Sequence, residues 1–222
     1  MISLLLGRGK FKDMIIKHIE NESGSKALNR VARKVFPELP EDNKEAIELF
    51  DDLVSMDDWS LFWMVTLWIK RRELYDLEFM EFYERWLYEH IDHWGKCDVY
   101  CYRVLNPMLE KHPQLFEDVM EWTGSSKTYV RRAAPVSLLQ STRSFKVNQS
   151  SDRVFKVVEK LKHDEEVHVQ KGVGWLLKYA YLSYPEEVQE YLKNDVDDLP
   201  RVIFRYALEK MPEDVRNELM GL

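Results

Sequence analysis

The sequence predicts an all-α protein, because its apolar residues recur at helical spacing and its helix-breaking residues recur at regular intervals. Leu61, Val65, Trp68 and Ile69 share one face of a helix, and the segments 79–87 and 154–161 repeat this pattern. No stretch shows the sustained alternation of a β-strand. Helical patterns of roughly ten to eighteen residues are separated by prolines, a glycine and a polar cluster, which are Pro107, Pro113, Gly124, 148–151, Pro185, Pro200 and Pro212.

Weak internal repeats indicate how these helices are arranged. Residues 130–139 resemble residues 169–177 at an offset of 39, and the segments that begin at Pro113 and Pro185 resemble each other at an offset of 72. These offsets are typical of one and two repeats of the HEAT type, each built from two or three helices. We therefore expect a HEAT-like α-α superhelix whose concave face holds the binding cleft.

Length and composition predict one soluble domain of residues 1–222. The chain has no Gly- or Ser-rich linker, and its longest apolar stretch, 59–69, is about half the length of a membrane-spanning helix. The apolar run 2–6 is too short for the core of a signal peptide. A cytoplasmic location follows, where Cys97 and Cys101 are expected to be free, half-buried thiols.

The charge is distributed unevenly along the chain. The net charge of −7 argues mildly against a nucleic-acid partner, but residues 125–178 hold eleven basic and five acidic side chains. Residues 46–98 hold five basic and thirteen acidic ones. This asymmetry suggests an anionic partner for the basic half, with ordinary solvated helix faces as the alternative.

Several residue clusters are more simply explained by structure than by chemistry. His90, His93, Cys97 and Cys101 cannot surround a metal from one straight helix, so we expect no metal site. The aromatic cluster of Trp59, Phe62, Trp63 and Trp68 is expected to pack in a core. His163 and His168 flank an acidic turn and are expected on the surface.

Residues 92–101, which read DHWGKCDVYC, are the most informative segment. Trp94 and Asp98 lie four residues apart and therefore share one face of a helix. A flat aromatic surface beside a carboxylate suits a developing sugar cation. On spacing alone the simpler alternative, a core Trp and a solvated or capping Asp, stays open.

Three motifs in order carry a resemblance to a known family. They are the pattern W-x-x-C-D of residues 94–98, the sequence VRRAA of residues 130–134, and VQKGVGWLLK of residues 169–178. In order and spacing they resemble the AlkD-like DNA glycosylases, over roughly residues 80–220. The resemblance implies hydrolysis of the N-glycosidic bond of cationic alkylated purines, such as 3-methyladenine and 7-methylguanine, in duplex DNA during base excision repair. It also implies that the damaged base stays stacked in the duplex.

The resemblance also implies a role for individual residues. Asp98 would stabilise the oxocarbenium-like sugar and orient a water, and Trp94 and Trp175 would pack against the deoxyribose. Arg132, Lys171 and Lys178 would bind phosphates beside the lesion, with Arg131 either assisting or facing solvent. No cofactor or partner subunit is required, so the expected species is a monomer that binds double-stranded DNA.

Departures from the family pattern carry their own expectations. Gly95 would loosen the helix that carries Trp94, since glycine costs about 1 kcal/mol against alanine inside a helix. Pro135 would kink the helix of Arg132. The region before Phe36 looks short, because only residues 24–33 resemble the family there. Two other functions therefore remain open, a non-catalytic paralogue that binds DNA structures and a HEAT-repeat scaffold for a protein partner.

Overall fold

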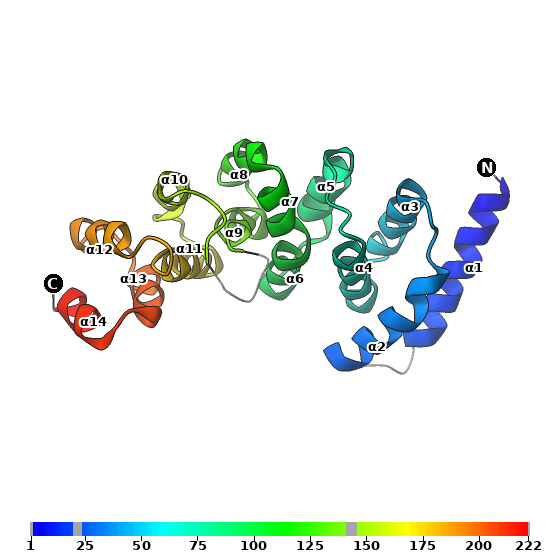
Figure 1. Ribbon diagram of the computed structural model, residues 1–222, viewed down its shortest axis with the longest axis horizontal. Coiled ribbons are helices and arrows are strands. Elements are labelled where there is room, and N and C mark those ends of the chain that lie inside the picture. Colours follow the sequence, from blue (N-terminus) through cyan, green and yellow to red (C-terminus); the bar gives the residue numbers. More distant parts are fainter. Residues whose placement is uncertain (1, 20–23, 141–145, 222) are drawn as a thin grey trace. The chain divides into compact units, whose positions relative to one another are not determined.

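The computed structural model describes residues 2–19, 24–140 and 146–221, and helices make up most of these ranges (Figure 1). Within them there is no β-strand, only one isolated antiparallel bridge between Leu139 and Val147. The predicted all-α class is therefore confirmed. No helix among these residues combines the length and the apolar character that a membrane span requires.

The chain divides into two compact units, the N-terminal unit Met1–Trp86 and the C-terminal unit Leu87–Leu222. The single domain of residues 1–222 stays a prediction. The helices of the N-terminal unit are α1 (Ile2–Ile19), α2 (Ser25–Val35), α3 (Asn43–Val54), α4 (Trp59–Arg72) and the first part of α5 (Met80–His90), with short 3-10 turns at Phe36–Glu38 and Leu77–Phe79.

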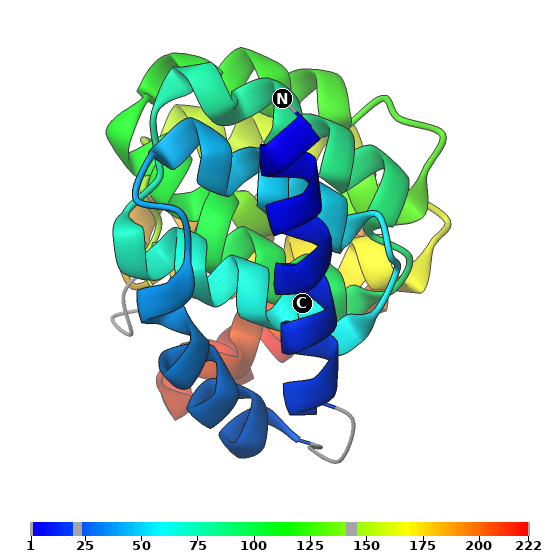
Figure 2. The ribbon, with the colours of Figure 1, turned by 90° about the vertical axis from the view of Figure 1, so that its right-hand side faces the viewer.

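Amphipathic packing holds the N-terminal unit together. The apolar face of α2 packs on α4, and the buried indole of Trp68 donates a 2.8 Å hydrogen bond to the carbonyl of Ala32. Asp42 and Asp58 cap the N-termini of α3 and α4 by accepting backbone N–H bonds. Figure 2 shows α1 in dark blue beside α2, with which it is in contact.

The aromatic cluster of α4 belongs to this packing. Phe62 and Trp68 are buried, and Trp68 stacks on Phe50, as expected for core residues. Trp59 and Trp63 are half-buried and their rings contact each other. The predicted core role of this cluster is therefore confirmed for its buried members.

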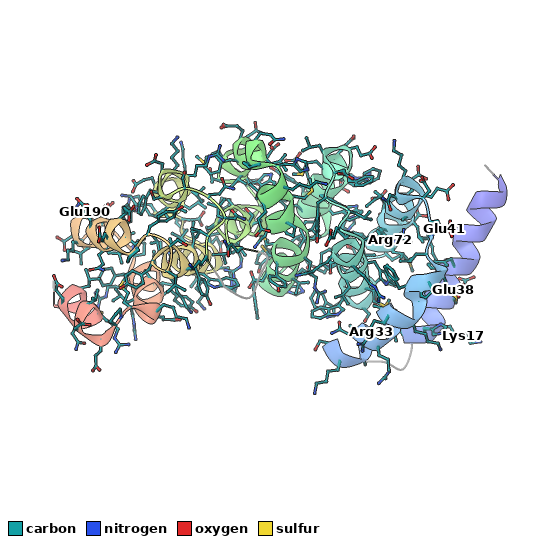
Figure 3. The ribbon with its side chains drawn as sticks, in the orientation of Figure 1. Lys17, Arg33, Glu38, Glu41, Arg72 and Glu190 are labelled. Carbon is teal, nitrogen blue, oxygen red and sulfur yellow. The ribbon has the colours of Figure 1, made fainter. Side chains whose placement is uncertain are left out.

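Charged side chains of the N-terminal unit lie around this core (Figure 3). Arg33 is exposed on α2, whereas the half-buried Arg72 at the end of α4 donates a hydrogen bond to the carbonyl of Pro40, next to Glu41. Burial lowers the pKa of Arg72. These contacts join the end of α4 to the segment that precedes α3.

The C-terminal unit consists of two rows of helices (Figure 1). The first row is α6 (Trp94–Tyr100), α9 (Thr128–Ser137), α11 (Val167–Ala180) and α13 (Arg201–Ala207), each in contact with the next. The second row packs on the first and contains α8 (Phe116–Trp122), α10 (Ser151–Leu161) and α12 (Pro185–Asn194). A π-helical turn (Cys101–Leu105), α7 (Asn106–Lys111), short 3-10 turns (Pro113–Leu115, Leu208–Lys210) and α14 (Glu213–Met220) complete the unit.

The internal repeats of the sequence correspond to equivalent helices in these rows. The segments 130–139 and 169–177 lie mainly on α9 and α11, which pack side by side. Pro113 and Pro185 start the 3-10 turn before α8 and helix α12, two helices of the second row. The weak sequence similarity therefore reflects a repeated helical unit, and its assignment to the HEAT class stays a prediction.

Pro135 does not end the helix of Arg132. Helix α9 continues through Pro135 to Ser137, so only two residues follow it. The ring of Pro135 packs against Gly172 of α11, where an added Cβ would lie 3.2 Å from the proline Cγ. Two departures from ordinary helix composition, a proline and a glycine, thus fit together where α9 meets α11.

Candidate active site

A cleft of about 430 Å³ lies along the first row of helices in the C-terminal unit. Side chains from α6, α9, α11 and α13 line it. We call this site the cleft, and its residues are Trp94, Asp98, Arg132, His168, Lys171, Trp175 and Tyr206. It therefore brings together all three residues predicted for catalysis and two of the four predicted for DNA binding.

The start of α6 positions Trp94 and Asp98. The imidazole of His93 caps the helix, accepting hydrogen bonds from the N–H groups of Gly95 (3.1 Å) and Lys96 (3.3 Å) at Nδ1. A Cβ on residue 95 would lie 3.1 Å from Cε1 of His93. Glycine makes room for this cap, and it stands in the first turn instead of the helix interior. The expectation that Gly95 loosens this helix assumed an interior position, whereas the glycine lies in the first turn; the loosening itself stays a prediction.

Asp98 and Arg132, which both line the cleft, form a bidentate ion pair. Nε and Nη2 of Arg132 donate to the two carboxylate oxygens at 2.9 and 3.0 Å. The side chain of Arg132 is 6% exposed, whereas that of Asp98 is 20% exposed. Nη1 of Arg132 donates to the carbonyl of His168. The guanidinium is thus fixed on α6 and α11 at once, and it orients the carboxylate in the cleft wall.

The electrostatics of this pair follow from its burial. Desolvation raises the pKa of Asp98 above its ordinary value, while the hydrogen bond and charge of Arg132 and the charge of His168 lower it. Burial lowers the pKa of Arg132, but the hydrogen bond and charge of Asp98 outweigh this and raise it. Arg132 therefore favours the ionised form of the carboxylate, against the effect of burial.

Two tryptophans flank Asp98. Trp94 is 55% exposed, more than any other large hydrophobic side chain that the structure describes as exposed. Trp175 of α11 is half-buried beside Tyr179. Trp94 is therefore not a core residue, and its exposed indole is open to contact from within the cleft.

Gly174 explains the last motif of the sequence in structural terms. An added Cβ there would lie 2.5 Å from Cβ of Tyr206 and 2.9 Å from the carbonyl oxygen of Ile203. Only glycine allows α13 to approach α11 this closely. The close approach brings Tyr206 into the same cleft as Trp175.

The four predicted DNA-binding residues are placed differently. Lys171 and Arg132 line the cleft, although the guanidinium of Arg132 is already hydrogen-bonded to the carboxylate of Asp98. Arg131 pairs with Asp164, and Lys178 pairs with Glu209 at 2.5 Å. Neither Arg131 nor Lys178 is among the residues that line the cleft.

Sequence reasoning missed two members of the cleft. His168 was expected on the surface, yet it lines the cleft, and its ring contacts that of Tyr129. Its spacing of three and seven residues before Lys171 and Trp175 marks one helical face, and that signal could have identified it. Tyr206 carries no such signal, because it reaches the cleft through the packing of α13 on α11.

The two cysteines are more buried than expected. Cys97 and Cys101 are free and fully buried, and their thiols contact the carbonyls of Tyr129 and Ala133 on α9. Burial raises the pKa of the Cys101 thiol, so it is not activated as a nucleophile. Among the residues that the structure describes, no cluster of His, Cys, Asp or Glu could hold a metal ion.

Comparison with known proteins identifies the family of this chain. The sequence profile of the family described as "DNA alkylation repair enzyme" matches residues 24–211, so the chain belongs to that family. The match begins at Gly24, just before α2, and leaves α1 outside it. A search of curated proteins finds no match.

A solved structure shows the same fold. It is described as a "Predicted DNA alkylation repair enzyme from Enterococcus faecalis", with a TM-score of 0.70 and 14% sequence identity. The alignment covers 86% of this chain and 87% of the other. At that identity the likeness establishes the helical architecture.

Proposed function

We propose that this protein is a DNA glycosylase that hydrolyses the N-glycosidic bond of cationic alkylated purines in duplex DNA. Membership of the DNA alkylation repair enzyme family supports DNA as the substrate. The observation that carries the proposal is the carboxylate of Asp98, held by Arg132 and flanked by Trp94 and Trp175 in one cleft. This is an arrangement for stabilising a cation in the sugar.

The chemistry requires little from the protein. An alkylated purine such as 7-methylguanine already carries a positive charge, so it leaves with the bonding electron pair and needs no general acid. The bond between C1′ and the purine nitrogen breaks, positive charge develops on the sugar, and a water oxygen then bonds to C1′ while its proton goes to solvent. What remains is electrostatic stabilisation and placement of the water.

Five of the seven cleft residues have a role in this scheme. Asp98 supplies negative charge beside C1′ and accepts a hydrogen bond from the attacking water. The electron-rich faces of Trp94 and Trp175 stabilise the sugar cation. Arg132 is a positioning residue, since its two bonds fix the carboxylate. Lys171 contacts a phosphate beside the lesion, and Lys178 and Arg131 extend this contact by exchanging their carboxylate partners for phosphates.

The direct test is to incubate methylated duplex DNA with the folded protein and measure free 7-methylguanine and 3-methyladenine. We expect release above the spontaneous rate. No release from protein whose fold is verified by circular dichroism contradicts the proposal. Salt-sensitive duplex binding without release would instead identify a non-catalytic DNA-binding protein, and no duplex binding would indicate a protein scaffold.

A further inference from the structure

Two residues of the cleft, His168 and Tyr206, have no part in the reaction proposed above. We propose that they complete, together with Lys171, a site for a single phosphate of the DNA backbone. The site binds this phosphate more tightly when His168 is protonated. The inference rests on the proposed function for the presence of DNA in the cleft, and it adds a pH-dependent contact to it.

The three side chains share the cleft and have hydrogen-bonding capacity that the protein does not use. Within the described part of the chain, no hydrogen bond or ion pair involves the imidazole of His168, the ammonium of Lys171 or the hydroxyl of Tyr206. All three side chains are half-buried, and none of their polar atoms lies buried without a partner, so a ligand can reach them. A protonated imidazole, an ammonium and a hydroxyl are all donors, which an anion requires.

The charges of the cleft also favour an anion. Among the described residues that line it, Asp98 is the one carboxylate, and the guanidinium of Arg132 pairs with both of its oxygens. These two charges compensate each other and leave the positive charge of Lys171 without a counter-ion in the cleft. Protonation of His168 adds a second positive charge. His168 also lies in the first turn of α11, where the helix dipole favours a negative ligand.

The order of residues along α11 fits a sugar followed by its phosphate. His168, Lys171 and Trp175 occupy one face of this helix and all line the cleft. At the rise of an α-helix, Lys171 lies about 6 Å along the axis from Trp175, and His168 about 4.5 Å further. With a deoxyribose against Trp175, a phosphate attached to that sugar reaches Lys171 and His168. Tyr206 joins them from α13, which approaches α11 closely at Gly174.

His168 is held in place by α9. Its carbonyl accepts a hydrogen bond from Nη1 of Arg132, and its ring contacts that of Tyr129. The carboxylates of residues 165 and 166 precede α11, are exposed and do not line the cleft. The titratable and charged groups that face His168 come from α6, α9, α11 and α13, and they are Asp98, Tyr129, Arg132, Lys171 and Tyr206.

The charge of His168 makes the affinity of this site depend on pH. A histidine side chain ordinarily changes its charge near about pH 6.5. A bound phosphate brings negative charge to the imidazole and therefore favours its protonated form. The contribution of His168 to binding is thus present at acid pH and is lost as the pH rises and the imidazole becomes neutral.

The test is to measure, by fluorescence anisotropy, how the affinity of the full chain for an undamaged DNA duplex depends on salt. Each phosphate that a positive side chain neutralises steepens the plot of log affinity against log salt by about 0.9. We expect the wild-type plot to be steeper at about pH 6 than at about pH 8.5, by up to about 0.9. Equal slopes at the two pH values, or no duplex binding by the folded protein, overturn the proposal.

Substitutions assign the effect to the site. His168→Gln should give equal slopes at both pH values, whereas Lys171→Gln should lower the slope by about 0.9 at both. Tyr206→Phe should weaken binding about two- to tenfold with the slope unchanged, because it removes a neutral donor. His163→Gln is the matched control that keeps the pH difference, since His163 is exposed and pairs with Asp198. A pH difference that survives in His168→Gln overturns the proposal.

The two proposals fail separately, because the duplex in this experiment contains no damaged base. A pH-dependent slope without release of 7-methylguanine from methylated DNA leaves the phosphate site and removes the glycosylase. Release of 7-methylguanine with a slope that is independent of pH leaves the glycosylase and removes the role of His168.

Discussion

Two tryptophans of the N-terminal unit differ in what surrounds them from two of the C-terminal unit, although the sequence presents both pairs at helical spacing. In the N-terminal unit Trp68 and Trp86 are buried, and their indole N–H groups donate to Ala32 and Asp51 at 2.8 and 2.7 Å. In the C-terminal unit Trp94 is 55% exposed and Trp175 is half-buried, and both line the cleft. Burial with a paired N–H marks a structural tryptophan, whereas the two tryptophans of the cleft are the ones that the proposed function uses.

Each unit also contains an Asp–Arg pair, and these differ in the same way. Arg85 and Asp51 meet at 2.6 Å with side chains 43% and 26% exposed. Arg132 and Asp98 are 6% and 20% exposed, so here the carboxylate is the more open partner. In the first pair Asp51 also serves the structure by accepting from Trp86. In the second, the buried guanidinium holds a carboxylate in the wall of the cleft.

The largest expected effect comes from replacing one tryptophan of each unit by alanine and comparing stability and base release. Trp68→Ala should lower the free energy of unfolding by about 3–5 kcal/mol, because it leaves a cavity in the core of the N-terminal unit. Trp94→Ala should change it by less than about 0.5 kcal/mol and should slow base release about tenfold, through the lost stabilisation of the sugar cation. Denaturant unfolding and single-turnover assays measure the two quantities. Equal destabilisation by both variants would erase the distinction between these tryptophans.

The next effect concerns the two arginines. Arg132→Gln leaves Asp98 without its counter-ion and should destabilise the fold by about 3–5 kcal/mol. Because Arg132 lowers the pKa of Asp98, its loss raises that pKa further above the ordinary value. A smaller fraction of carboxylate is then ionised at each pH, so the acid limb of the activity profile moves to higher pH.

The control for this variant is Arg85→Gln in the partly exposed pair. It should cost about 0–1 kcal/mol and leave the pH profile of base release in place. The profile is measured at a temperature where both variants are folded. An unmoved acid limb in Arg132→Gln would mean that Asp98 does not set it.

A smaller effect is expected at two glycines. Gly174→Ala forces a Cβ to within 2.5 Å of Tyr206 and should destabilise the fold by about 1–3 kcal/mol. Gly9→Ala in α1 has open space around it and should stabilise by about 1 kcal/mol, through the helix preference of alanine. Thermal unfolding distinguishes them. Opposite signs confirm that the glycine of the last motif is a packing requirement, and a neutral Gly174→Ala would contradict it.

Sequence reasoning captured what lies within a single helix. Trp94 and Asp98 are one turn apart on α6, and Lys171 and Trp175 are one turn apart on α11, as helical periodicity requires. Helical breaks and internal repeats likewise predicted the all-α class. These features depend on local spacing, which the chain specifies directly.

Contacts between helices could not be predicted in this way. The Asp98–Arg132 bond joins residues 34 apart, and it exists because α6 packs on α9. Tyr206 reaches the cleft because Gly174 has no side chain, which lets α13 pack closely on α11. The start of α6 at Trp94 and its cap by His93, which place Gly95 in the first turn, could not be predicted either. Each depends on tertiary packing or on a cap geometry that periodicity does not encode.

The most direct measurement compares the two carboxylates by the same substitution. Single-turnover release of 7-methylguanine from a duplex with one lesion is measured for the wild type, Asp98→Asn and Asp51→Asn. Asp98→Asn should slow release by about 10²–10³-fold, the usual effect of losing one electrostatic group at a reacting centre, while Asp51→Asn stays within about twofold of the wild type. Wild-type release by folded Asp98→Asn would contradict the role of the cleft carboxylate.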